Sequence, residues 1–156
     1  MGKKKETKKQ LANKPSSDDD MELVVDGAVP CRIPDGIYEA TVINVKPTYR
    51  YNRQMVDFLF QLATPGYIGQ RLPGYAALQA NGKPGSRSKL TSWWVFIAEL
   101  EQLARPERIA LRRFKAYRFQ VLVGKSKKDG DNKEVPEGRR LSTIQEIIGI
   151  VGRVKP

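Results

Sequence analysis

The sequence contains no histidine, and its only cysteine is Cys31. Histidine is the side chain that most often serves as a general acid or base near neutral pH, and it is a common zinc and iron ligand. One cysteine cannot form an intrachain disulfide or a cysteine metal cluster. No catalytic motif is recognisable among the remaining residues. We therefore expect a protein that is not an enzyme and has no catalytic residues, no metal site and no cofactor.

The sequence also lacks a run of about 20 apolar residues, the length that a membrane-spanning helix requires. Its basic amino terminus leads into polar residues and three aspartates at 18–20 instead of an apolar signal segment. We expect a cytoplasmic protein with no membrane partner. Residues 1–20 contain too few apolar side chains to offset the entropy of ordering, which predicts a disordered basic tail. Residues 21–156 remain as one domain.

What the sequence has in excess is positive charge. Lysine and arginine number 28 against 17 acidic residues, a formal net charge of +11. The tail contributes six lysines and four acidic residues, so most of the excess belongs to the predicted domain. Such an excess favours polyanionic partners, which include DNA, RNA and acidic membrane surfaces.

Alternating apolar and polar residues predict that the domain is built mainly of strands. In the first of them, Tyr38, Ala40 and Val42 alternate with polar or outward residues. Glycine and proline make the third predicted strand irregular. Residues 147–151 could instead form a β-turn-β or a short helix. The expected strands are 37–46, 54–62, 67–78, 114–123 and 139–148, with a further short edge strand at 21–25.

One main helix is predicted after the third strand. Ser88 is a suitable N-cap, and apolar residues from Leu90 to Leu100 recur at helical spacing. Pro106 should stop this helix and could open a short second one at 107–112. Because adjacent tryptophans cannot both face the centre of a core, we expect Trp94 at the edge of the apolar stripe or on a partner surface.

This order of elements predicts a mainly β fold, a five-stranded OB-like β-barrel with the main α-helix between strands three and four. The layout resembles the OB-fold single-stranded DNA-binding proteins of bacterial phages and mobile elements. The resemblance is carried by residues 36–42, 58–62 and 88–90 and covers about residues 36–148. The chain lacks the acidic carboxyl-terminal tail of bacterial single-strand-binding proteins, so their mode of partner recruitment is not implied.

Two loops carry the residues that point to nucleic acid. Arginine and lysine neutralise phosphates, and tyrosine offers a flat face on which an unpaired base can stack. On the sheet, Tyr117 with Lys115 and Arg139 would form an outward platform and its basic rim, although strand tyrosines such as Tyr67, Tyr75 and Tyr117 usually pack into the core. The predicted loop residues are Tyr49, Arg50, Tyr51 and Arg53 in the first tip and Lys125, Lys127 and Lys128 in the second.

These patterns predict a non-catalytic protein that binds single-stranded DNA in DNA replication or recombination. Base stacking and phosphate contacts in a basic groove would make binding largely tolerant of sequence. One alternative is a protein-interaction module of a replication complex, which would use an open edge strand or Trp94. Another is an RNA-binding accessory factor, because stacking and phosphate contacts occur with both nucleic acids. Replication or recombination proteins are candidate partners, and the oligomeric state stays open.

Overall fold

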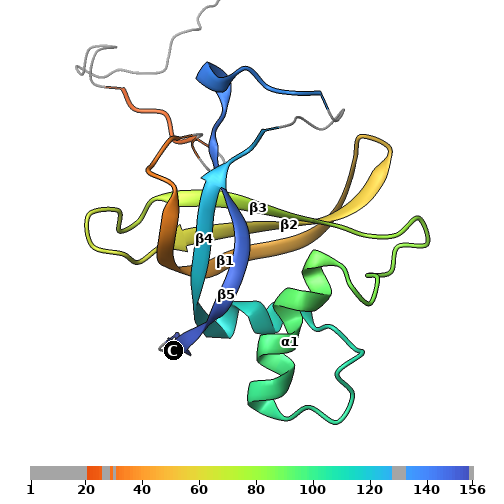
Figure 1. Ribbon diagram of the computed structural model, residues 1–156. Helices are drawn as coiled ribbons and strands as arrows, with labels where there is room; N and C mark the ends of the chain where they lie inside the picture. Colours follow the sequence, from red (N-terminus) through yellow and green to blue (C-terminus); the bar gives the residue numbers. More distant parts are fainter. Residues whose placement is uncertain (1–20, 26–28, 30, 128–132, 155–156) are drawn as a thin grey trace, which may run out of the picture.

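The protein is mainly β-structure, with one α-helix (Figure 1). The computed structural model describes residues 21–25, 29, 31–127 and 133–154, so the tail predicted at 1–20 lies outside the described residues. The helix α1 (Lys89–Glu101) lies between the third and fourth strands, as predicted. Two 3₁₀-helices, η2 (Leu111–Ala116) and η3 (Glu137–Arg139), precede β4 and β5. The strands are β1 (Gly36–Arg50), β2 (Arg53–Leu62), β3 (Arg71–Ala77), β4 (Tyr117–Lys125) and β5 (Ser142–Arg153).

The five strands form a closed sheet in the order β1-β2-β3-β5-β4, and β4 pairs back onto β1. All neighbours are antiparallel except β3 and β5, which meet through the single parallel pair Gly74 and Ile144. A Cβ atom at position 74 would lie 2.8 Å from Phe60 Cε1 and 3.3 Å from Ile144 Cβ. Glycine is therefore required where the sheet closes, because a larger residue would push β3 away from the core.

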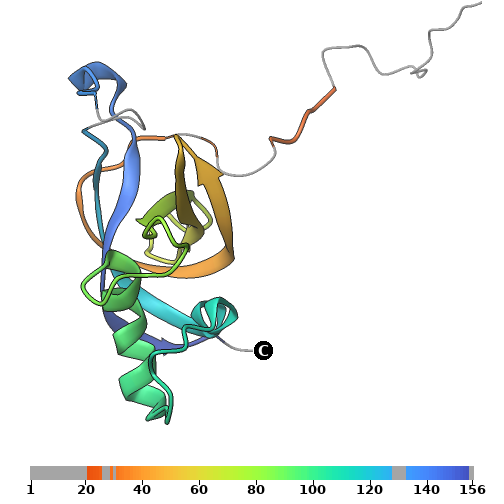
Figure 2. The same ribbon diagram turned by 90° about the vertical axis from the view of Figure 1, so that its right-hand side faces the viewer.

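The core follows the alternation of the strands. In β2, Val56, Phe58, Phe60 and Leu62 are buried, and the residues between them face outward. The ring of Trp93 on α1 lies edge-on to both phenylalanines, with centroids 5.2 and 6.0 Å away. Helix α1 thus places an aromatic side chain over one end of the closed sheet, and the view turned by 90° keeps the helix at that end (Figure 2).

Helix α1 begins where the sequence predicts. The Ser88 side chain accepts a hydrogen bond from the Thr91 backbone N–H at 3.2 Å. Trp94, however, is buried like its neighbour Trp93, so its predicted place at the edge of the stripe or on a partner surface is wrong. The chain after α1 folds back over this side chain, and Trp94 Nε1 donates to the Pro106 carbonyl at 2.8 Å. Leu100, assigned to the buried stripe, is exposed instead.

Other predicted elements differ in type or position. Residues 21–25 are exposed and form no strand. The short second helix expected at 107–112 is the 3₁₀-helix η2, which begins only at Leu111 and runs to Ala116. Arg139 belongs to η3 and not to the final strand. That strand, β5, continues through 147–151, because three register shifts against β4 absorb its irregular stretch. Within the residues that the structure describes, no helix is long and apolar enough to cross a membrane.

Candidate nucleic-acid interface

The hairpin tip, which we define as residues 49–53, projects beyond the closed sheet. Its two central residues, Tyr51 and Asn52, have φ angles of 53° and 59°. Left-handed backbone at both positions is typical of the two-residue turn that matches the twist of paired strands. Because the turn lies beyond the core, 67% of Tyr49 and 57% of Tyr51 is exposed. The tip therefore presents two aromatic rings to solvent, as the sequence predicts.

Arg50 in the tip is held by its neighbours. Its guanidinium forms an ion pair with Asp57 and lies 5.2 Å from the centre of the Tyr75 ring. The hydrogen bond to Asp57 raises the pKa of Arg50 further above its usual value. The Asp57 carboxylate, which also accepts a hydrogen bond from Thr48 at 3.2 Å, offsets the charge of Arg50. Arg53, directly across the hairpin, is exposed and forms no ion pair with any residue that the structure describes.

Tyr75, which the sequence analysis expects to pack in the core, stands instead on the outward face of the sheet below the tip. It pairs across the strands with Asp57, and 37% of it is exposed. Partial burial raises the pKa of Tyr75, and the nearby Arg50 opposes that shift. The alternation of β2 indicates that Asp57 faces outward between the buried Val56 and Phe58, but only the register between β2 and β3 identifies Tyr75 as its partner. The outward face of β1, β2 and β3 comprises Lys46, Thr48, Arg50, Met55, Asp57, Leu59, Gln61, Arg71, Pro73, Tyr75 and Ala77.

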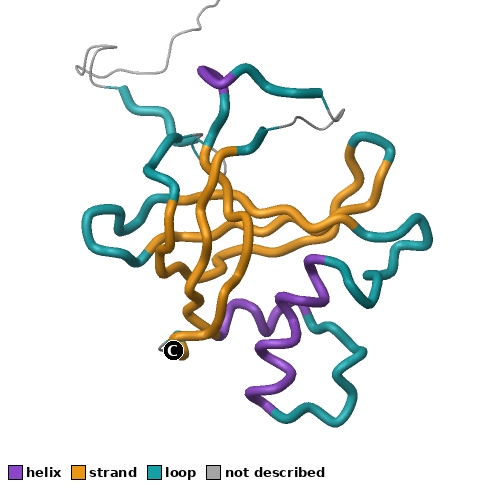
Figure 3. The backbone as a smooth tube through the Cα atoms, viewed as in Figure 1, coloured by secondary structure: helices purple, strands orange, loops and turns teal. Residues whose placement is uncertain are grey.

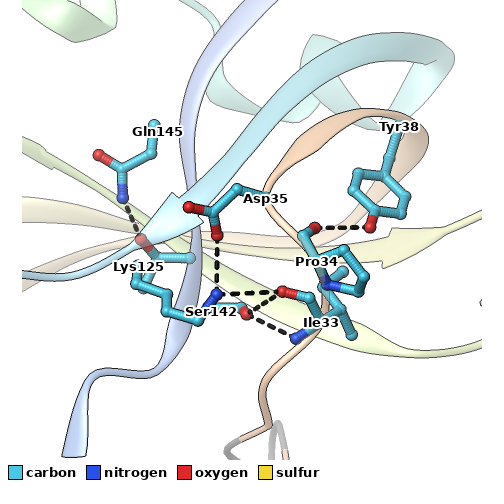
Figure 4. A network of polar contacts seen from close by, with 8 residues as sticks. Ile33, Pro34, Asp35, Tyr38, Lys125, Ser142 and Gln145 are labelled. Atoms are coloured by element: carbon cyan, nitrogen blue, oxygen red, sulfur yellow. Dashed lines mark hydrogen bonds and ion pairs between the residues drawn. The ribbon is translucent and has the colours of Figure 1, made fainter. Parts of the chain in front are cut away.

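The second loop, residues 126–141, follows directly after Lys125, whose ammonium group already bonds to other residues of the protein. Lys125 Nζ lies 2.9 Å from Asp35 Oδ1 and 3.5 Å from the Ile33 carbonyl (Figure 4). Ser142 reinforces this contact from β5, since its hydroxyl accepts from the Ile33 backbone N–H at 2.8 Å. Lys125 therefore fastens the segment before β1 to the start of the second loop.

Two predicted residues of this region are exposed. Lys127 and Arg139 both face solvent, whereas Arg140 donates to the Val135 carbonyl at 2.8 Å and pairs with Glu134 at 3.5 Å. Lys128 lies outside the described residues. The described part of the second loop thus offers exposed cations at Lys127 and Arg139, whereas Arg140 bonds within the loop.

Tyr117 is not part of an outward platform, because its ring is fully buried and its hydroxyl donates to Glu101. The guanidinium of Arg153 covers the ring at 5.0 Å from its centre. Burial and the neighbouring Glu101 raise the pKa of Tyr117. The prediction of an exposed aromatic at this position is wrong, since β4 turns Tyr117, Phe119 and the alternate residues after them into the core.

The hairpin tip and the second loop rise from the same end of the closed sheet, and α1 lies at the other end (Figures 1 and 3). Lys115 does not join them. It is exposed on η2, next to the start of β4, at the end that holds α1. Of the predicted residues, the structure gathers Tyr49, Tyr51, Arg53, Lys127 and Arg139 as exposed side chains at one end, and it separates Lys115 and Tyr117 from them.

The end of the molecule that carries the hairpin tip and the second loop thus offers aromatic rings for stacking and cations for phosphates.

Among the described residues, no group of three or more cysteine and acidic side chains comes together as a metal site would require. Comparisons with protein-family models, with curated proteins and with solved structures found no match for this chain.

Proposed function

We propose that the chain is a non-catalytic single-stranded DNA-binding protein built on an OB-fold. The ring order β1-β2-β3-β5-β4, with a helix between β3 and β4, agrees with the arrangement of that fold. OB-folds bind oligonucleotides through the face of strands two and three and through the loops that join strands one to two and four to five. The outward face with Tyr75, the hairpin tip and the second loop occupy these places.

The observation that carries the proposal is the exposure of Tyr49 and Tyr51 beside Arg53. An exposed tyrosine contributes no core packing, and each stacked base is worth about 1–3 kcal/mol. A duplex keeps its bases stacked on one another, so tip tyrosines favour an unpaired strand. Arg53 and Lys127 would neutralise phosphates along the path of that strand.

Tyr75 extends the proposed path from the tip onto the sheet. Arg50 lies over its ring, and a base that reached this position would add to a stack of two flat groups. The partly exposed apolar side chains Leu59 and Pro73 continue the outward face beyond it. A strand that entered at the tip would thus meet further stacking and apolar surface on β2 and β3.

A role in DNA replication or recombination is part of the proposal, because those processes expose single strands. RNA binding is the first alternative, since stacking and phosphate contacts serve both nucleic acids. A protein-interaction module is the second. The burial of Trp94 removes one of the two contacts on which that alternative depended.

The test is fluorescence anisotropy with a labelled strand of about 30 nucleotides as single-stranded DNA, duplex DNA and RNA, over a series of salt concentrations. We expect the single DNA strand to bind most tightly, with affinity that falls as salt rises by about 0.7 logarithmic units per neutralised phosphate. Tyr49→Ala with Tyr51→Ala should weaken this binding at least about tenfold, because two stacked bases are lost.

A matched control is Ile68→Ala with Leu100→Ala, which removes two exposed side chains distant from the tip along the chain. This variant should bind the single strand like the unaltered protein. Equal, weak binding of all three nucleic acids would contradict the proposal. So would unchanged affinity in the tyrosine variant.

A further inference from the structure

Within the part of the chain that the structure describes, the largest local excess of positive charge lies away from the two loops. Residues 105–118 contain six lysine or arginine residues and one glutamate. This segment runs from the loop after α1 through η2 to the start of β4. It therefore lies at the α1 end of the closed sheet (Figure 1).

Some of these cations serve the fold. Arg113 pairs with Glu101, and Arg118 pairs with Glu39 at 3.1 Å. Arg105 pairs with Glu107 at 2.6 Å. The first two pairs join the segment to α1 and to β1, and the third lies within the segment. Together they leave part of its charge uncompensated.

Three exposed cations account for the positive charge of residues 105–118 that no ion pair compensates. Arg108, Arg112 and Lys115 form no ion pair with any residue that the structure describes. Arg112 and Lys115 stand three residues apart in a 3₁₀-helix, a spacing that places both side chains on the same side. Arg153 approaches from β5, because it pairs with Tyr117 at the start of β4. Val154, next to Arg153, donates to the Ala116 carbonyl beside Lys115. We call Arg112, Lys115 and Arg153 the lower basic patch.

The lower basic patch has charge without exposed aromatic rings. Phe114 and Tyr117, the aromatic residues of this segment, are buried. A surface of this kind contacts phosphates through its charges and presents no aromatic ring on which a base could stack. It therefore suits the sugar–phosphate backbone of a nucleic acid irrespective of its sequence.

We propose that the lower basic patch is a second nucleic-acid contact, which binds the phosphate backbone of a strand whose other part lies in the tip site. This inference rests on the proposed function. The nine residues of β4 separate the patch from the second loop by roughly 26 Å. An oligonucleotide too short to span this distance therefore occupies the tip site alone, whereas a long strand engages both surfaces.

The test compares Arg112→Gln with Lys115→Gln against Lys83→Gln with Arg87→Gln, which removes the same charge from exposed positions in the loop before α1. Both variants are titrated with oligothymidylates of about 4 and about 30 nucleotides. We expect the patch variant to bind the long strand at least about fivefold more weakly, with a salt slope lower by about 1.4. Its affinity for the short strand, and both affinities of the control, should stay within about twofold of the unaltered protein.

Equal affinities of the two variants for the long strand would overturn the inference. An acidic peptide is the other occupant to test, with a polyglutamate of about ten residues as the probe. Loss of polyglutamate binding in the patch variant, with strand binding intact, would also overturn it. The tyrosine variant of the tip separates the two proposals. If only the tyrosine variant loses long-strand binding, the proposal for the lower basic patch is rejected and the tip site is retained. If only the patch variant loses long-strand binding, the tip site is rejected and the patch is retained.

Discussion

The hairpin tip and the segment 105–118 are both basic, but they place their aromatic side chains in opposite ways. In the tip, Tyr49 and Tyr51 are exposed next to Arg53. In the segment, Tyr117 and Phe114 are buried, and the guanidinium of Arg153 covers the Tyr117 ring. Charge alone attracts any nucleic acid, whereas an exposed aromatic ring selects unpaired bases. The position of the rings, more than the number of charges, therefore marks the tip as the site that would distinguish single strands.

Of the substitutions considered, the largest effect on stability should come from one that disrupts the packing at the α1 end of the closed sheet. Trp94→Ala removes the buried ring that packs on Phe114 and donates to the Pro106 carbonyl. We expect a loss of about 3–5 kcal/mol in the free energy of unfolding, measured by urea denaturation. The conservative variant Trp94→Phe should lose clearly less. Equal stability of Trp94→Ala and the unaltered protein would show that the loop after α1 does not depend on this side chain.

Tyr75 tests whether an aromatic ring that is exposed on the sheet, and not on the hairpin tip, also selects single strands. Tyr75→Ala should weaken single-strand binding by about 1–3 kcal/mol if a base stacks there, and leave duplex binding unchanged. Tyr75→Phe keeps the ring and should retain the affinity. Anisotropy with both ligands measures the difference. A loss of equal size for duplex would mean that Tyr75 acts through the fold of the hairpin.

Asp57→Asn tests whether Arg50 is withheld from phosphates by its ion pair. The pair is partly exposed, so its loss should cost only about 0.2–1 kcal/mol of stability. The released guanidinium should raise the slope of affinity against salt by about 0.7. Thermal denaturation and a salt series measure the two effects. An unchanged or lower slope would indicate that Arg50 acts only in shaping the face around Tyr75.

The smallest effect is confined to alkaline pH. Folding raises the pKa of Tyr117 above the ordinary tyrosine value of about 10. The stabilisation from its protonated form is complete below pH 10 and is lost as the pH rises through the higher folded pKa. Tyr117→Phe should therefore show a shallower fall of melting temperature between about pH 9 and 11. A fall as steep as in the unaltered protein would assign the dependence to other groups, such as Tyr38, whose pKa burial also raises.

Much of the fold could be predicted because local patterns determine it. The alternation in β2 and the Ser88 cap depend on neighbouring residues, and the structure has both. Trp94 could not be placed in the same way, because it is covered by a loop that returns twelve residues later at Pro106. The length of β5 likewise depends on bulges against β4, which appear only in the pairing.

In the candidate site, too, the features that depend on neighbouring residues could be predicted, and those that depend on distant contacts could not. The exposure of Tyr51, in a tight turn, and of Tyr49, two residues before it at the end of β1, follows from their place at the tip of a hairpin, which sequence can indicate. The engagement of Lys125 with Asp35 could not be foreseen, because it joins residues 90 positions apart. Tyr75 was assigned to packing because its outward position depends on the register between β2 and β3.

The most direct measurement is the fluorescence of a Tyr51→Trp variant during titration with single-stranded and duplex DNA. The two natural tryptophans, Trp93 and Trp94, are buried, so they supply a constant background. The account predicts quenching of the added tryptophan by the single strand, as bases stack on it, and little change with duplex. Binding of the single strand with no change in this fluorescence would contradict the claim that the hairpin tip is a stacking site.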